Sequence, residues 1–259
     1  MEEVGESIGS KVLSYEPRDE AALAALSMTS EEFIEEVLPV FQRSRWTKLI
    51  LCENELDNSA IIALAEVLAL GTSSLKSLDL GSNRISDEGV AALTRVLPRT
   101  QLEELILYGN AVSNAAVSLL AERLQSCSLH TLDLHENQIT DVGAIYLARA
   151  VRLHPPLQSL DLSTNSISDV GARQLLTAMR HSQLNFLILG ENPRISPAIR
   201  AEVERTEGLI REEFKIMVAL CSVRTVSRLG QHSLLRELPI DLIRKLSCMY
   251  YNLPDANTL

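Results

Sequence analysis

Leucine and asparagine recur through the middle of the chain in one fixed register. The repeated pattern is L-x-x-L-x-L-x-x-N, and its asparagines are Asn54, Asn83, Asn110, Asn137, Asn165 and Asn192. Their spacings are 29, 27, 27, 28 and 27 residues. A period of about 20 to 30 residues is typical of proteins built from stacked copies of one structural unit. Six such units are therefore predicted over residues 46–205.

The L-x-L segment of each unit predicts a short strand. Alternate residues of a strand point to opposite faces, so the two leucines point inward and the residue between them points outward. Stacked strands of this kind form a parallel sheet, and the rest of each unit covers its inner face. The asparagine follows at the turn, where its amide is expected to be buried and bonded to backbone groups.

After each asparagine, the apolar residues follow a helical period. A residue suited to cap a helix comes first, namely Asp57, Ser86, Ser113, Thr140 or Ser168. A small residue lies three positions later and large apolar residues follow at intervals of four, as in Gly143, Leu147 and Val151. This spacing predicts a helix with one buried side. The small residue is expected to let the helix approach the sheet closely.

The unit length and the segment I-S-D-x-G-A, as in residues 167–172, resemble the ribonuclease-inhibitor class of leucine-rich repeats. The resemblance implies an α/β fold, a curved solenoid with parallel strands on the concave face and helices on the convex face. Helical caps are expected at both ends. The first copy has Trp46 in place of the leading leucine, and the last has an extra residue before Ile195. Terminal repeats are expected to differ in this way.

The flanking segments do not follow the repeat. Residues 1–18 are polar and without a period, so we expect them to be flexible. Residues 19–45 are predicted as an N-terminal helical cap, because Thr29–Glu32 form a capping box ahead of an apolar helical face. Residues 206–259 are predicted as a C-terminal helical cap or a small helical appendage.

Composition and charge narrow the classes of function. Of the 259 residues, 46% are hydrophobic and only 4% aromatic, which suits a core of aliphatic side chains. The net charge of -10 and the lack of basic tracts argue against nucleic acid as a partner. No apolar run approaches 18 residues and no secretory signal pattern opens the chain, so no membrane association is expected. Four scattered cysteines favour the cytosol, or a host cytosol for a delivered bacterial effector.

Motifs for catalysis and cofactor binding are missing from the sequence. It contains no G-x-x-x-x-G-K-[ST], H-E-x-x-H or G-x-S-x-G, so no enzyme activity and no cofactor are predicted. His130 and His135 lie close together without a further ligand in place, so no metal site is predicted. The column of Asp79, Asp133 and Asp161 is interpreted as framework, because L-D-L is common in this repeat class.

The outward residues of the strands predict a protein-binding face. Eight acidic residues lie on or beside it, against Lys48 and Lys76. Apolar residues within a charged rim are typical of binding surfaces, although single exposed apolar residues are also common. A protein partner with a basic or polar surface is expected to bind here, and a monomer is favoured. The predicted contact residues are Asp79, Glu104, Ile106, Tyr108, Asp133, His135, Asp161, Phe186 and Ile188.

Two other functions are compatible with the resemblance. One branch of this repeat class accelerates GTP hydrolysis on a small GTPase with a residue from a loop after a strand, and Arg84 occupies such a loop. Residues 238–251 resemble the start of an F-box, the helical motif that docks on a ubiquitin-ligase subunit, which would make the protein an adaptor. A capping helix with proline in its first turn explains that segment more simply.

Overall fold

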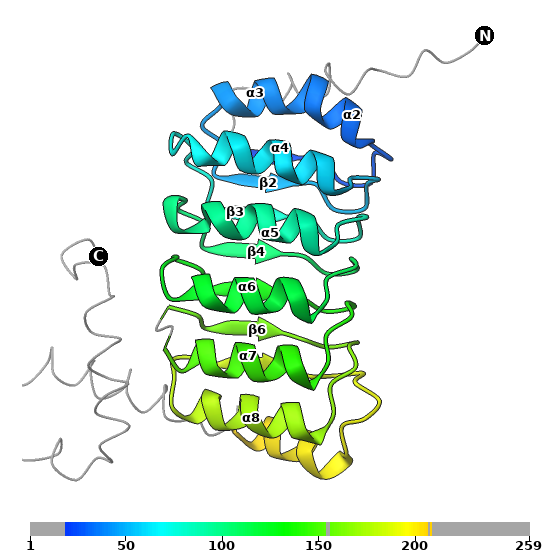
Figure 1. The fold of residues 1–259 in the computed structure, drawn as a ribbon, viewed down its shortest axis with the longest axis vertical. Helices are drawn as coiled ribbons and strands as arrows, with labels where there is room; N and C mark the ends of the chain where they lie inside the picture. Colours follow the sequence, from blue (N-terminus) through cyan, green and yellow to red (C-terminus); the bar gives the residue numbers. More distant parts are fainter. Residues whose placement is uncertain (1–18, 154–155, 207, 209–259) are drawn as a thin grey trace, which may run out of the picture.

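The protein folds as a curved solenoid of two layers, a parallel sheet and a row of helices that covers one side of it (Figure 1). The structure is a computed structural model that describes residues 19–153, 156–206 and 208. Seven strands pair in chain order from β1 (Glu20–Ala22) to β7 (Phe186–Ile188). The predicted α/β solenoid is confirmed. The predictions for residues 1–18 and 209–259, including the F-box-like segment, lie outside the described residues.

Strands and helices alternate through the repeats. The inner strands are β2 (Lys48–Ile50), β3 (Ser77–Asp79), β4 (Glu104–Ile106), β5 (Thr131–Asp133) and β6 (Ser159–Asp161). The helices are α4 (Asn58–Ala69), α5 (Asp87–Val96) with the 3₁₀ turn η2 (Leu97–Arg99), α6 (Asn114–Leu124), α7 (Asp141–Val151) and α8 (Asp169–Arg180). Residues 197–206 are also helical. None of the helices in the described residues has the length and apolarity that a membrane crossing needs.

The N-terminal segment contains a strand that the sequence analysis did not predict. Strand β1 pairs with β2 in the same parallel register as the regular strands. The helical part of this N-terminal segment consists of α2 (Ser30–Glu32), the π-helical turn η1 (Phe33–Val37) and α3 (Leu38–Arg43). The predicted capping box between Thr29 and Glu32 is present. The strand was missed because Ala21 takes the place of the inward leucine, which weakens the hydrophobic alternation.

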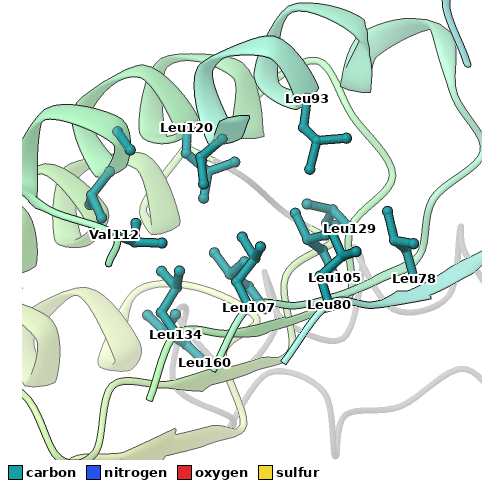
Figure 2. Packing of buried hydrophobic residues seen from close by; sticks show 14 of the residues in the cluster. Leu78, Leu80, Leu93, Leu105, Leu107, Val112, Leu120, Leu129, Leu134 and Leu160 are labelled. Atoms are coloured by element: carbon teal, nitrogen blue, oxygen red, sulfur yellow. The ribbon is translucent and has the colours of Figure 1, made fainter. Parts of the chain in front are cut away.

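The core lies between the sheet and the helices (Figure 2). Strand leucines such as Leu105 and Leu134 face the helix leucines Leu93 and Leu120. All four are at most 1% exposed. Burial of one such side chain contributes about 1.5–3 kcal/mol. The two layers are therefore held together by several inward leucines from each regular unit, as the predicted helical stripe requires.

Each repeat asparagine joins two consecutive turns. The Nδ2 of Asn137 donates to two carbonyl oxygens of its own turn and to the Leu107 oxygen of the preceding unit, at 3.0–3.2 Å. Its Oδ1 accepts from the Val112 N–H at 3.0 Å. The residue before it, Glu136, has a left-handed backbone with φ 53°, which costs free energy for any residue but glycine. The amide thus stabilises an unfavourable turn.

The predicted bonding of the asparagines to backbone is confirmed, but their predicted burial holds only in part. The buried ones are Asn54, Asn165 and Asn192. Asn83, Asn110 and Asn137, in the middle repeats, are partly exposed.

A second row of side chains joins the helix N-termini. Asp141, the first residue of α7, accepts hydrogen bonds from the N–H groups of Ser168 at 2.8 Å and Gly171 at 2.9 Å in the next unit. Asn58 and Asn114 make the equivalent bonds. A Cβ atom on Gly171 would lie 2.7 Å from Oδ1 of Asp141. The small residue therefore lets its helix pack closely against the helix of the preceding unit. The sequence analysis predicted close packing against the sheet instead, which was wrong.

The predicted helix caps are present with one exception. The side chains of four of them accept a hydrogen bond from the first turn of the helix, namely Asp57, Ser113, Thr140 and Ser168. Ser86 makes no such bond. Its hydroxyl instead accepts from the Asn58 side chain at 2.8 Å, so it belongs to the bonds between units rather than to its own helix.

Candidate protein-binding face

The strand register brings the predicted face residues together in rows across the concave sheet. Glu104 on β4 lies beside Thr131 on β5, and Ile106 lies beside Asp133. Asp133 in turn lies beside Asp161 on β6, and Asp161 beside Ile188 on β7. Each strand is only three residues long, so its outward residues are its first and last, and the middle leucine is buried. All nine predicted residues therefore share one continuous surface.

Their exposure differs along the solenoid. Phe186 and Ile188, at the C-terminal end of the sheet, are 43% and 45% exposed. Ile106 and Tyr108, near the middle, are half-buried. The apolar surface that a partner can reach on this face is thus greatest on β7, whereas the middle of the face is dominated by polar side chains.

Tyr108 is held against the sheet rather than projecting from it. Its ring stacks on the His135 ring, with the centroids 4.7 Å apart and the planes 7° from parallel. A Cβ atom on Gly81 would lie 2.0 Å from Cε1 of Tyr108, so only glycine leaves room for the ring. Sequence reasoning predicted Tyr108 and His135 but missed the role of Gly81. The signal was present, since Gly81 occupies the same column one unit earlier.

The aspartates of the face each bond the residue two positions ahead. Oδ1 of Asp133 accepts from the His135 N–H at 3.0 Å and lies 2.8 Å from its Nδ1. Oδ1 of Asp161 accepts from the Ser163 N–H at 2.8 Å and from its hydroxyl at 2.6 Å. Asp79 accepts from the Gly81 N–H at 3.0 Å. These bonds fix the chain after each strand and give L-D-L a structural role as well as an outward carboxylate.

Negative charge accumulates in the middle of the face. Burial raises the pKa of Asp79, and the charges of Asp133 and Glu104 add to the effect. Both lysines of the face are paired with other acids: Lys48 lies 3.6 Å from Glu20, and Lys76 lies 2.8 Å from Glu103. Within the described residues, no lysine or arginine forms an ion pair with Asp133 or Asp161.

The side chains of this face are poorly suited to bind a metal ion or to act as a nucleophile. One donor atom each from Asp133, His135 and Asp161 lie within 4.8 Å of one another, the one such group in the described part of the chain. Hydrogen bonds within the sheet already engage all three side chains. Cys52, at the edge of the face, has its thiol pKa raised by burial and then by Asp79, which disfavours the reactive thiolate.

The convex side differs in charge from the concave face. Exposed arginines lie along helices α5 to α8, namely Arg95, Arg123, Arg149, Arg152, Arg173 and Arg180. Sequence reasoning missed a group of exposed apolar residues on α6, α7 and α8, namely Leu119, Val142, Tyr146 and Val170. Their signal was a large apolar residue on the outer side of a helix, where the other units carry small or polar ones.

Arg84 follows Asn83 in the loop after β3, where the GTPase-activating alternative places it. Its side chain forms an ion pair with Glu55, at 3.0 Å, and remains 68% exposed. A residue that contributes to catalysis on a partner protein must leave such a pair on binding.

Comparisons with known proteins agree with this architecture. A family model described as Leucine Rich repeat matches residues 73–93, 125–148 and 154–176. No curated protein sequence matches the chain. The solved structure of leiomodin-1 actin-binding site 2 is 15% identical over 63% of this chain and 95% of that chain, with a TM-score of 0.54. The tropomodulin C-terminal domain of Caenorhabditis elegans is 16% identical over 60% and 96%, with a TM-score of 0.52.

At these identities the two structures are similar to this chain in fold alone. The repeats themselves are shown directly. The asparagine ladder, the single parallel sheet in chain order and the three matched segments show that this chain is built from leucine-rich repeats.

Proposed function

We propose that this leucine-rich repeat protein is a non-enzymatic interaction module that binds a partner protein on its concave face. The observation that carries the proposal is the uncompensated acidic surface of β3 to β6, bordered by the exposed apolar residues of β7. The leiomodin-1 domain of similar fold is an actin-binding site, so a solenoid of this kind can serve a protein-binding role. A cytosolic setting, in the cell of origin or in a host, follows from the scattered cysteines.

Charge defines the surface expected on the partner. A surface with eight acids and two lysines, both paired, favours a partner that presents basic or polar groups. Exposed charges are screened over about 8 Å at physiological ionic strength, so binding is expected to weaken as salt is raised. Phe186 and Ile188 supply apolar contacts beside the acidic region.

Affinity capture of the full chain, followed by mass spectrometry, tests the proposal. The partner is expected to lose at least about tenfold in affinity for the double variant Tyr108→Ala with Phe186→Ala, because buried aromatic contacts dominate interface energies. A convex pair of exposed apolar residues, Leu119→Ala with Tyr146→Ala, serves as the control. Melting curves of both variants confirm that they are folded. Full affinity for the concave variant, together with insensitivity to salt, would rule out this face.

A further inference from the structure

The middle of the concave face offers two adjacent carboxylates with acceptor capacity to spare. Asp133 and Asp161 are cross-strand neighbours on β5 and β6, and both are half-buried. Their Oδ1 atoms accept hydrogen bonds from His135 and Ser163. Within the described residues, no hydrogen bond reaches either Oδ2 atom. Since adjacent strands lie about 4.8 Å apart, the two Oδ2 atoms can be reached by one planar group with several N–H donors.

A flat ring pair lies next to these carboxylates. The His135 ring is bonded to Asp133 through Nδ1 and stacks on Tyr108. Gly81 lets the Tyr108 ring lie against the sheet. The next residues in the same column, Ser163 and Gly190, are small and leave the space beyond His135 uncrowded.

These features distinguish between cationic groups. A guanidinium is planar, carries five N–H donors, stacks on aromatic rings and is more weakly hydrated than an ammonium. It therefore suits a half-buried site that combines paired carboxylates with stacked rings. A lysine ammonium is a compact, strongly hydrated charge and uses neither the planarity of the rings nor the separation of the two carboxylates.

We propose that the partner inserts an arginine side chain between Asp133 and Asp161, with its guanidinium beside the Tyr108–His135 ring pair. This inference rests on the proposed function, since it names the group that the concave face recognises. Ile188 lies next to Asp161 across the sheet, on β7. In an extended segment that crosses the strands, residues rise about 3.3 Å each, so an apolar side chain one or two positions from the arginine reaches Ile188.

A random dodecapeptide library displayed on phage, selected on the full chain, tests the inference. Enriched peptides are expected to contain an arginine with an apolar residue one or two positions away. Each enriched peptide is then synthesised with arginine, lysine or the neutral isostere citrulline. We expect lysine to weaken binding several-fold and citrulline to weaken it at least about tenfold, because the ion pairs and charge-assisted hydrogen bonds are lost.

Two variants of the protein locate the contact. Asp133→Asn with Asp161→Asn keeps the Oδ1 acceptors of both side chains and removes their charges, so the strands should remain intact. The arginine peptides are expected to bind it at least about tenfold more weakly. Glu88→Gln with Glu122→Gln removes two exposed acids from the convex helices and should leave their affinity unchanged. Melting curves check that both double variants are folded.

The outcomes separate the inference from the proposed function. Peptides that lack arginine, or no enriched peptides at all, overturn the inference, and partner capture then judges the function independently. Peptides that weaken with Tyr108→Ala and Phe186→Ala but show no preference for arginine overturn the inference and support the function. Peptides indifferent to every concave substitution contradict both. Titration with zinc chloride alone tests whether the site binds a metal ion instead. Saturable zinc binding that Asp133→Asn abolishes, together with peptides that show no preference for arginine, would overturn the arginine site in favour of a metal site.

Discussion

The first unit, residues 19–45, and the central unit, residues 129–153, have the same strand and turn but not the same repeat sequence. Both have a strand in parallel register with its neighbours. Both place a left-handed residue at the turn, Ala25 with φ 55° and Glu136 with φ 53°. The central unit then has Asn137, whereas the first unit has Leu26 in the same position. The turn of the first unit therefore lacks the asparagine side chain that each of the six repeats has at its own turn.

This turn is held by Asn54 of the next unit, which bonds it as each repeat asparagine bonds the turn before it and adds a bond from the Leu26 N–H. Its Oδ1 accepts from the N–H groups of Leu26 at 3.1 Å and Met28 at 3.0 Å, and its Nδ2 donates to the Leu23 oxygen at 2.8 Å. The first unit is thus shaped by its neighbour rather than by its own repeat sequence. In a solenoid, stability is the sum of the units and the interfaces between them. A terminal unit can lose its consensus residues as long as the interface is kept.

Removal of the first unit should have the largest effect. Without residues 1–45, the buried leucines Leu49 and Leu51 of β2 face water, together with an unpaired strand edge. We expect aggregation, because terminal repeats need a covering unit. Size-exclusion chromatography with light scattering measures it. Removal of residues 1–18 alone is the control and should leave a soluble monomer. A soluble, equally stable protein after the longer truncation would show that the first unit does not act as a cap.

Core truncation should cost less and should separate the two units. Leu134 and Leu23 occupy equivalent positions and are both at most 1% exposed. Leu134→Ala is expected to cost roughly 3–5 kcal/mol through the cavity it leaves, within the range for buried leucines. Leu23→Ala is expected to cost about 2–3 kcal/mol, because a terminal unit can relax into the space. Urea unfolding measures both free energies. Equal losses would contradict the distinction, and unchanged stability of Leu134→Ala would contradict the repeat assignment.

Removal of the asparagine side chains should cause the next largest loss of stability. Asn137→Ala removes the acceptor of the buried Val112 N–H and one of the two amides that donate to the Leu107 oxygen, which keeps Asn110. An unsatisfied buried polar group costs about 1–3 kcal/mol, so global stability should fall by that amount. Asn54→Ala is expected to raise hydrogen exchange within residues 19–45 while global stability changes less, because the first unit can open by itself. Exchange that rises equally along the whole chain would refute this difference.

The regular units could be predicted from the sequence because their signals repeat. The leucines, the asparagine and the cap residue recur in each copy, so the pattern is not a chance match. Equivalent positions of consecutive copies then lie side by side, which gives the strand register. Strand β1 could not be predicted, because Ala21 and Leu26 replace the two most diagnostic residues. The strand is held by its pairing with β2, and the turn after it by hydrogen bonds to Asn54, which is 28 residues from Leu26.

The candidate face was predictable in position but not in detail. The register placed Asp133 beside Asp161 without any structure, since both end an L-D-L segment. The stacking of Tyr108 on His135 and its dependence on Gly81 follow from side-chain packing, which a repeat pattern does not encode. The row of bonds between helix N-termini was also missed, although Asn or Asp recurs after most caps, as at Asp141.

The smallest expected difference between the two units is in their response to low pH. It arises from carboxylates at the junctions between units. Burial alone would raise the pKa of Asp141, but hydrogen bonds from Ser168 and Gly171 hold that pKa below its usual range. At the first junction, hydrogen bonds from Ser59 and then Ser30 lower the pKa of Asp57. A lowered pKa in the folded state means that each carboxylate stabilises the fold above its unfolded pKa of about 3.9. That contribution is lost as the pH falls through the folded value.

Substitution by asparagine removes this titration and keeps the hydrogen bonds, as Asn114 already does at the junction equivalent to Asp141. Melting temperatures between about pH 6 and pH 2 are therefore expected to fall less steeply for Asp141→Asn than for the unsubstituted protein. Asp57 bonds Ser30 of the first unit and also caps its own helix α4 through Ser59. Asp57→Asn should therefore reduce the acid-induced rise of hydrogen exchange in residues 19–45 and in the first turn of α4, with little change in the melting profile. Parallel pH profiles for Asp141→Asn and the unsubstituted protein would show that Asp141 does not stabilise the fold through its charge.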